Sequence, residues 1–140
     1  MPHPGSVSLP PCRELTWRTT THQLVDDLRF PLATEVSYRS HDPFAVRFAF
    51  QLPEEAVVWD LERDMLRFGT EAPAGGGDIR IRPAPYNRTL LRLGAVGNYA
   101  LVLVERTPLL RFLDRTFEVV APGTEGGHID WGPLYDARAD

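Results

Sequence analysis

Alternation of apolar and polar side chains runs through most of this chain, and it narrows the possible folds more than any other feature. The clearest case is residues 44–50, in which apolar positions alternate with small or charged ones (Phe44, Val46, Phe48 and Phe50 against Ala45, Arg47 and Ala49). Side chains of a β-strand point alternately to opposite faces, so a two-residue period predicts a half-buried strand. The same pattern predicts six further strands, at residues 14–19, 33–39, 55–60, 79–82, 88–93 and 99–105.

Turn residues between these segments predict antiparallel pairing. Pro53 and Glu54 separate residues 44–50 from residues 55–60, which favours a hairpin. Residues 94–98 separate the last two strands in the same way. A polar loop at Asp26 and Asp27 and a turn at residues 41–43 divide the earlier strands.

Two segments change from the strand period to helical spacing. Leu61, Met65 and Phe68 predict a first helix, with Asp60 as its N-cap and Gly69 at its end. A second helix is expected to begin at residues 107–108, a threonine followed by proline, and to end before residues 122–123. Seven mostly antiparallel strands with two helices predict an α+β fold.

Chain length and composition indicate the domain organisation. A chain of 140 residues favours one domain, expected over residues 13–140. Residues 1–12 contain four prolines and predict a flexible N-terminal tail. Residues 70–77 and the C-terminal residues 124–140 are expected to be irregular. Phe48 and Trp59 are predicted core residues.

The charge and cysteine content limit the class of protein. The formal net charge is −4, which gives no general attraction to nucleic acid or to anionic membranes. The single cysteine, Cys12, allows no internal disulfide, and we expect it to be buried or half-buried in a reducing compartment. With no apolar run of membrane-spanning length and no signal-peptide pattern, the sequence predicts a cytoplasmic protein without membrane insertion.

No motif predicts catalysis, and no catalytic, cofactor-binding or metal-ligating residue is assigned. His128 and Asp130 lie two apart, but a metal site needs three or four ligands. The run Gly75, Gly76 and Gly77 is followed by Asp78 and a strand, whereas a phosphate-binding loop leads into a helix. The sequence therefore favours a non-enzymatic protein.

Arginines in the region 78–93 leave a second interpretation open. Four of them are predicted on neighbouring strands with one tyrosine between them (Arg80, Arg82, Arg88, Arg92 and Tyr86). Such a sheet face could follow the backbone of a single-stranded nucleic acid and stack a base. The alternative is that these arginines simply face solvent, which the negative net charge favours.

Several short segments occur in a recognisable order: residues 42–46 (DPFAV), 58–59 (VW), 63–66 (RDML), Gly69, 77–83 (GDIRIRP), 112–113 (FL), 122–125 (PGTE) and Asp130. Together with their surroundings they cover roughly residues 28–130. In this order they resemble the SsgA/SsgB-like family of sporulation and cell division regulators of actinobacteria, most closely its SsgB-like members. The absence of lysine among the 15 basic residues suits the GC-rich genomes of that group.

The resemblance implies a fold, a function and partners. It implies a whirly-like arrangement of sheet and helices, and a non-enzymatic regulator that helps position the sporulation septum by recruiting the tubulin-like protein FtsZ. An SsgA-like protein is the second implied partner, and assembly into a homo-oligomer, a dimer or a trimer, is expected. The implied location is the cytoplasm at the division septum. Candidate partner-contact residues are Gly75, Gly76, Gly77, Arg80 and Arg82.

Overall fold

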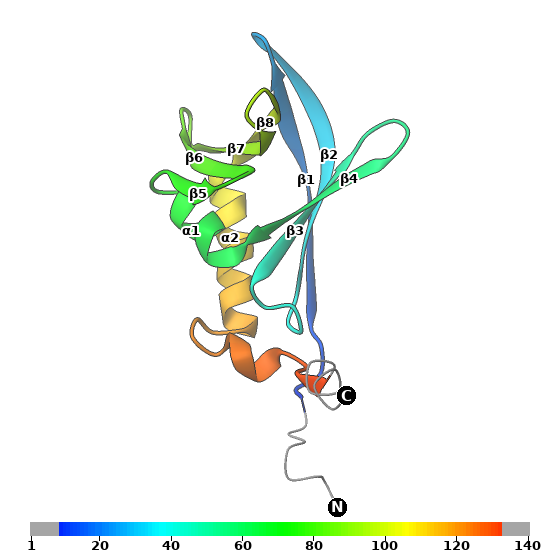
Figure 1. Ribbon diagram of the computed structural model, residues 1–140, viewed down its shortest axis with the longest axis vertical. Helices are drawn as coiled ribbons and strands as arrows, with labels where there is room; N and C mark the ends of the chain where they lie inside the picture. Colours follow the sequence, from blue (N-terminus) through cyan, green and yellow to red (C-terminus); the bar gives the residue numbers. More distant parts are fainter. Residues whose placement is uncertain (1–8, 133–140) are drawn as a thin grey trace, which may run out of the picture.

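The alternating segments assemble into one curled antiparallel sheet, with two helices on its inner side (Figure 1). The structure is a computed structural model that describes residues 9–132. Its strands are β1 (Glu14–Val25), β2 (Leu28–Arg39), β3 (Ala45–Gln51), β4 (Ala56–Glu62), β5 (Ala74–Gly76), β6 (Ile79–Ala84), β7 (Arg88–Ala95) and β8 (Asn98–Glu105). Their order in the sheet is β4-β3-β2-β1-β8-β7-β6-β5. This confirms the α+β class, with eight strands in the described chain where the sequence predicts seven.

The eighth strand is β5, which lies inside the predicted loop at residues 70–77. Ala74 pairs with Ile81 and Gly75 pairs with Arg80, so β5 extends the sheet beyond β6. Glycine has no side chain, so a glycine-rich strand shows no alternation of apolar and polar residues, and the sequence did not predict this one. At Gly75 the backbone has φ +114°, and a Cβ atom would clash with the carbonyl oxygen of Ile79. The close approach of the two strands therefore requires glycine there.

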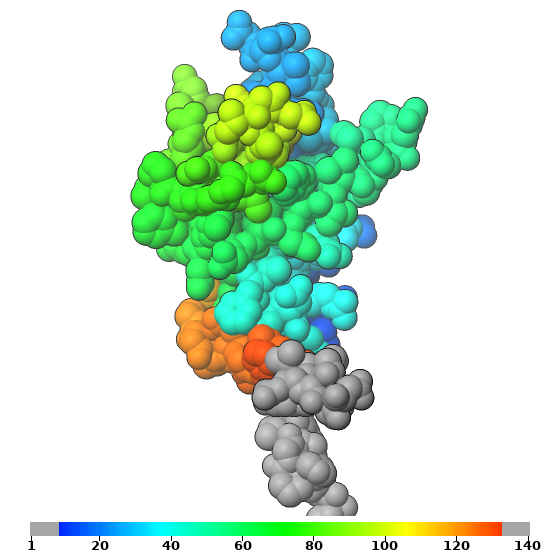
Figure 2. All heavy atoms as spheres, in the orientation of Figure 1, coloured from blue at the N-terminus to red at the C-terminus, as the bar shows by residue number. Residues whose placement is uncertain are grey.

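The first two strands are each 12 residues long, about twice the predicted length. They pair along their whole length, from Glu14 opposite Arg39 to Val25 opposite Leu28. A two-residue turn at Asp26 and Asp27 joins them, with Asp26 in the left-handed conformation. Figure 2 shows the tip of this hairpin and the tip of the β3–β4 hairpin protruding from the body of the molecule.

Both helices begin at different residues from those predicted. Helix α1 (Arg63–Gly69) starts after β4 has continued through Asp60 to Glu62. Asp60 is therefore not an N-cap, because its carboxylate is held across the sheet by Arg47 at 2.8 Å. Helix α2 (Arg106–Val119) starts one residue before Thr107, whose hydroxyl accepts a hydrogen bond from Asn87. Neither helix of the described chain is long and apolar enough to cross a membrane.

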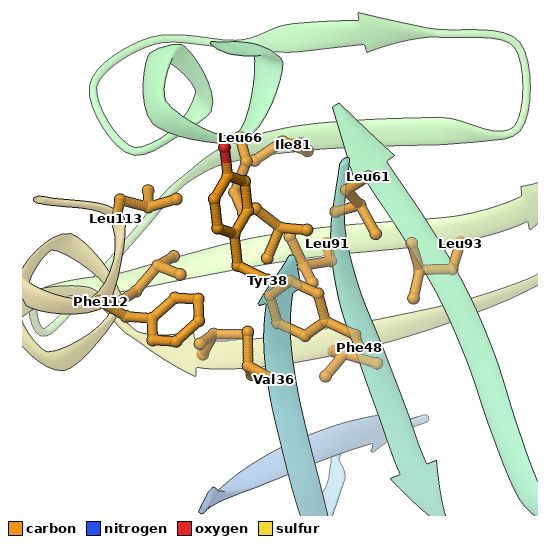
Figure 3. Close-up of a cluster of buried hydrophobic side chains, with 14 of the residues drawn as sticks. Val36, Tyr38, Phe48, Leu61, Leu66, Ile81, Leu91, Leu93, Phe112 and Leu113 are labelled. Atoms are coloured by element: carbon orange, nitrogen blue, oxygen red, sulfur yellow. The ribbon is translucent and has the colours of Figure 1, made fainter. Parts of the chain in front are cut away.

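The core lies between the inner face of the sheet and α2 (Figure 3). Val36 and Phe48 from the sheet and Leu113 from the helix are buried there. The rings of Trp17 and Phe112 stack at 5.9 Å. Phe48 is 0% exposed, as predicted, but its cross-strand neighbour Trp59 is only half-buried and packs against the core from its margin.

A charged side chain, Arg63, is also buried in this core. It is 1% exposed, and its Nη1 donates to the hydroxyl of Tyr38 and to the carbonyl oxygens of Thr116 and Val120 at 2.8–3.0 Å. Its guanidinium carbon lies 4.4 Å from the ring centre of Phe117. Arg63 therefore joins the start of α1 to the end of α2 and to β2.

The two ends of the described chain lie at the same end of the molecule along its longest axis (Figure 1). Cys12 is exposed, so the prediction of a buried or half-buried thiol is wrong. The ring of His41 lies 2.8 Å from the carbonyl oxygen of Pro10. Residues 1–8 of the predicted tail lie outside the described residues. After α2, residues Glu125–His128 form a single 3₁₀ turn.

Candidate binding surface

The outer face of β6, β7 and β8, away from the helices, carries the arginines that the sequence singled out. Strand register places Arg80 opposite Arg92 and Arg82 opposite Leu90. Arg92 is in turn opposite Leu101 of β8. Their neighbours along the strands, such as Ile81 and Leu91, point inward and are buried. The alternation thus separates an apolar inner face from a cationic outer face.

Three of these arginines line one hollow of about 450 Å³, here called the arginine hollow. Its lining residues are Pro73, Ala74, Gly75, Arg80, Ile81, Arg82, Leu90, Arg92, Tyr99 and Leu101. Gly75 forms part of its edge through β5, whereas the predicted contact residues Gly76 and Gly77 are not among the lining residues. No acidic side chain of the described residues lines the arginine hollow.

The charges in the arginine hollow are not neutralised by the described part of the chain. Its four ion pairs involve other arginines: Arg18 with Glu35, Arg39 with Glu14, Arg47 with Asp60, and Arg67 with Glu71. The guanidinium of Arg92 lies 5.4 Å from the ring centre of Tyr99, and its buried Nε has no hydrogen-bond partner among residues 9–132. Arg80 and Arg92 face each other directly, and like charges in that position destabilise a sheet.

Arg88 and Tyr86 lie outside the arginine hollow. They line an adjoining hollow of about 400 Å³, together with Arg29 and the acidic residues Asp26 and Asp27 of the β1–β2 turn. Tyr86 is 86% exposed at the β6–β7 turn, and the guanidinium of Arg88 lies 5.3 Å from its ring centre. Arg82 and Leu90 line both hollows, so the two lie next to each other. The five residues of the nucleic-acid hypothesis therefore do not share one hollow.

A third hollow, on the outer face of β2, β3 and β4, differs in its charge balance. It measures about 300 Å³, and Arg47 and Asp60 both line it. Arg47 donates two hydrogen bonds to the carboxylate of Asp60, at 2.8 and 3.0 Å. This pairing lowers the pKa of Asp60 and raises that of Arg47. Arg47 and Asp60 neutralise each other, so neither side chain of this pair is left to bind a charged ligand.

The structure brings no metal-binding cluster together within residues 9–132. No group of three or more histidine, cysteine, aspartate or glutamate side chains occurs there in a suitable arrangement. The ring of His128 is partly buried and its Nδ1 atom has no hydrogen-bond partner.

Sequence reasoning did not single out Leu90, Tyr99 and Leu101 as members of the surface. The signal was present, because strict alternation from Arg92 places Leu90 on the same face, and hairpin pairing brings Tyr99 and Leu101 beside them. These three side chains make the floor and wall of the arginine hollow partly apolar. The arrangement suits a ligand with carboxylates beside an apolar group.

Comparison with known proteins finds similarity across most of the chain. Residues 32–125 match the sequence model of the family described as Streptomyces sporulation and cell division protein, SsgA. The sporulation-specific cell division protein SsgB of Salinispora tropica is 38% identical over 111 residues, which cover 75% of this chain and 78% of that protein. SsgB of Kineococcus radiotolerans is 34% identical over 109 residues, covering 74% of this chain and 66% of that protein.

Two solved structures have a similar fold. An SsgA-like sporulation-specific cell division protein from Thermobifida fusca superposes with a TM-score of 0.80 at 29% identity, covering 90% of this chain and 96% of that one. SsgB from Streptomyces coelicolor, in a structure concerned with mutations that correlate to longitudinal cell division during sporulation, gives a TM-score of 0.78 at 29% identity. That match covers 84% of this chain and 96% of that one.

Proposed function

Because this chain belongs to the SsgA family of sporulation and cell division proteins, we propose that it regulates sporulation-linked cell division by binding other proteins. The observation that carries the proposal is the family match over residues 32–125. It is supported by relatives named as sporulation-specific cell division proteins at 34–38% identity. The family is one of division regulators, and we propose that this member likewise performs no chemistry.

The proposed partner is FtsZ, which this protein would bring to the site of the sporulation septum. The sequence resemblance to SsgB-like members supports this assignment, and an SsgA-like protein is the second proposed partner. The protein would then act in the cytoplasm at the septum. An outer sheet face with three arginines that form no ion pair within residues 9–132 offers a surface on which a protein partner could dock.

Self-association is part of the proposal. Strands β4 and β5 are the two ends of the sheet, so each leaves one row of backbone groups without a strand partner in the described chain. Such edges often pair with a second copy, and closed symmetry then gives a dimer or a trimer. Sedimentation velocity on the full chain tests this. A monomer at every accessible concentration would contradict it.

Co-sedimentation with FtsZ filaments tests the proposed partner. The purified chain is mixed with FtsZ of the same organism and GTP, and the filaments are pelleted. We expect saturable recovery of the chain in the pellet. The controls are the chain alone and FtsZ with GDP, in which filaments do not form. A chain that stays in the supernatant across a range of salt concentrations would refute FtsZ as a direct partner.

A further inference from the structure

We propose that the arginine hollow is a binding site for an extended acidic peptide of a partner protein. A carboxylate of that peptide would lie between Arg80 and Arg92, and an adjacent apolar side chain would contact Leu90 and Leu101. The inference rests on the proposed function, because it names the surface through which a protein-binding regulator would hold its partner.

The first argument is charge. A chain of net charge −4 collects three arginines in one hollow, with no acidic side chain of the described residues among its lining. Arg80 and Arg92 stand directly opposite each other across β6 and β7. Their repulsion costs free energy in the unbound protein, and a bound carboxylate would relieve it. Two guanidinium groups also match a carboxylate in geometry, because each can donate paired hydrogen bonds.

The second argument is the shape of the hollow. Leu90 and Leu101 lie on adjacent strands in its floor, beside the arginines. Carboxylates displayed near an aliphatic side chain would therefore match both parts of the lining. A free inorganic anion would leave the apolar floor uncovered. The volume of about 450 Å³ is enough for a few residues of a peptide.

The third argument favours a peptide over a single-stranded nucleic acid. Stacking of successive bases needs several free aromatic faces, but Tyr99 is the one aromatic residue of the described chain that lines the arginine hollow, and Arg92 already lies against one face of its ring. The adjoining hollow, which a longer strand would have to enter, mixes Asp26 and Asp27 with its arginines, so it lacks the uniformly cationic lining that a phosphate backbone would follow. By contrast, the edge strand β5 borders the arginine hollow and could pair with the backbone of an extended peptide.

The test measures binding of a short dye-labelled peptide in which glutamates flank a leucine, by fluorescence anisotropy with the full chain. We expect binding that weakens with added salt. The variant Arg80→Gln/Arg92→Gln should bind at least about tenfold more weakly, since it removes both guanidinium groups that would donate to the carboxylate. The matched control is Arg111→Gln/Arg115→Gln, which removes two exposed arginines of α2 and changes the net charge equally. The control should bind like the wild type.

Three results would overturn the inference: no binding of the glutamate peptide, equal loss in both double variants, or equal binding of the same peptide with glutamines. A single-stranded oligothymidylate is the third probe. If it displaces the peptide and binds more tightly, the surface is a nucleic-acid site instead. Thermal unfolding of each variant confirms that it is folded.

The FtsZ experiment separates this inference from the proposed function. If the wild type pellets with FtsZ filaments but binds no acidic peptide, the proposed function stands and the inference fails. If the peptide binds and FtsZ does not, the hollow is real and its partner is a different protein.

Discussion

Among single residues, Arg63 departs furthest from what its chemical class suggests. A guanidinium is usually exposed, yet this one is buried and forms no ion pair with a carboxylate of the described residues. Backbone carbonyls at the end of α2 and the tyrosine hydroxyl accept its hydrogen bonds, and two aromatic rings flank it. The carbonyl end of a helix carries partial negative charge, so α2 stabilises the cation by its direction as well as by its contacts.

Truncating this side chain should damage the fold. Arg63→Ala leaves a cavity and removes three hydrogen bonds, so we expect it to lower the free energy of unfolding by about 3–5 kcal/mol. Arg67→Ala on the same helix is the matched control. It removes an exposed pair with Glu71 and should cost less than about 1 kcal/mol. Urea unfolding measures both, and similar costs for the two variants would contradict the role assigned to Arg63.

Tyr38, which accepts from Arg63 and donates to the carbonyl oxygen of Pro43, should make the protein sensitive to high pH. Burial raises the pKa of Tyr38 to about 12, against 10.0 for a free tyrosine. The folded state therefore favours the protonated form. This contribution is fully present below about pH 10 and is lost as the pH rises through about 12.

The variant Tyr38→Phe tests that dependence. It cannot ionise, so its free energy of unfolding should fall less between about pH 10 and about pH 12 than that of the wild type, by roughly 1–3 kcal/mol. At neutral pH it should be about 1–2 kcal/mol less stable, because the hydroxyl contacts are gone. Parallel pH curves for the two proteins would show that Tyr38 does not titrate as expected.

For the secondary-structure elements, the contact between α1 and β6 controls how the helix sits on the sheet. Gly69 ends α1 directly over Ile81, and a Cβ atom at Gly69 would come within 2.6 Å of the Cβ of that fully buried side chain. The helix can therefore approach the sheet this closely only without a side chain at its last residue.

Two glycine substitutions separate packing from glycine content. Gly69→Ala forces Ile81 or the helix to shift and should cost about 1–3 kcal/mol. Gly76→Ala, in β5, meets no atom within 4 Å and has an ordinary backbone conformation, so it should be nearly neutral. Thermal unfolding compares them. If Gly76→Ala is the more damaging of the two, the assigned position of β5 is wrong.

The sequence predicts these elements only as far as local pattern reflects them. Strands with regular alternation, such as β3, are found almost to the residue. The end of β1 is missed because Thr21, His22 and Gln23 are all polar and interrupt the alternation of apolar and polar residues. Strand β5 is missed because its glycines have no side chains to alternate. Asp60 suggests an N-cap locally, but Arg47 on the neighbouring strand holds it in β4. Tertiary contacts therefore decide the boundaries that local pattern leaves open.

At the scale of the whole molecule, the outer face of the sheet combines two kinds of charge arrangement. On β1 to β4 charges are paired across strands, whereas the arginines of β6 and β7 form no ion pair within residues 9–132. Alternation alone was enough to predict that Arg80, Arg82 and Arg92 share a face. The exclusion of acidic side chains from their hollow depends on the sheet's curl and on where β5 lies, which sequence does not show.

An unpaired cationic face implies that stability and binding conflict there. Arg80→Glu places a carboxylate opposite Arg92, so we expect a gain of about 0.2–1 kcal/mol in unfolding free energy together with loss of acidic-peptide binding. The control with the opposite expectation is Arg18→Glu. It places a second glutamate directly opposite Glu35 and should lower the free energy of unfolding by a similar amount. Urea unfolding and peptide anisotropy on the same samples test both. Destabilisation by Arg80→Glu would contradict the repulsion inferred between Arg80 and Arg92.

The pairing of β1 with β8 has a consequence for how the chain folds. Within the described chain, every other pairing in the sheet joins strands that follow one another in sequence, whereas this one joins Gln23 to Val102 through a short register. Local hairpins close quickly, while a contact between residues about eighty positions apart must close a long loop. The four-stranded meanders β1–β4 and β5–β8 would therefore form first. The slow step of folding would be the pairing of β1 with β8, which joins the two meanders into one sheet.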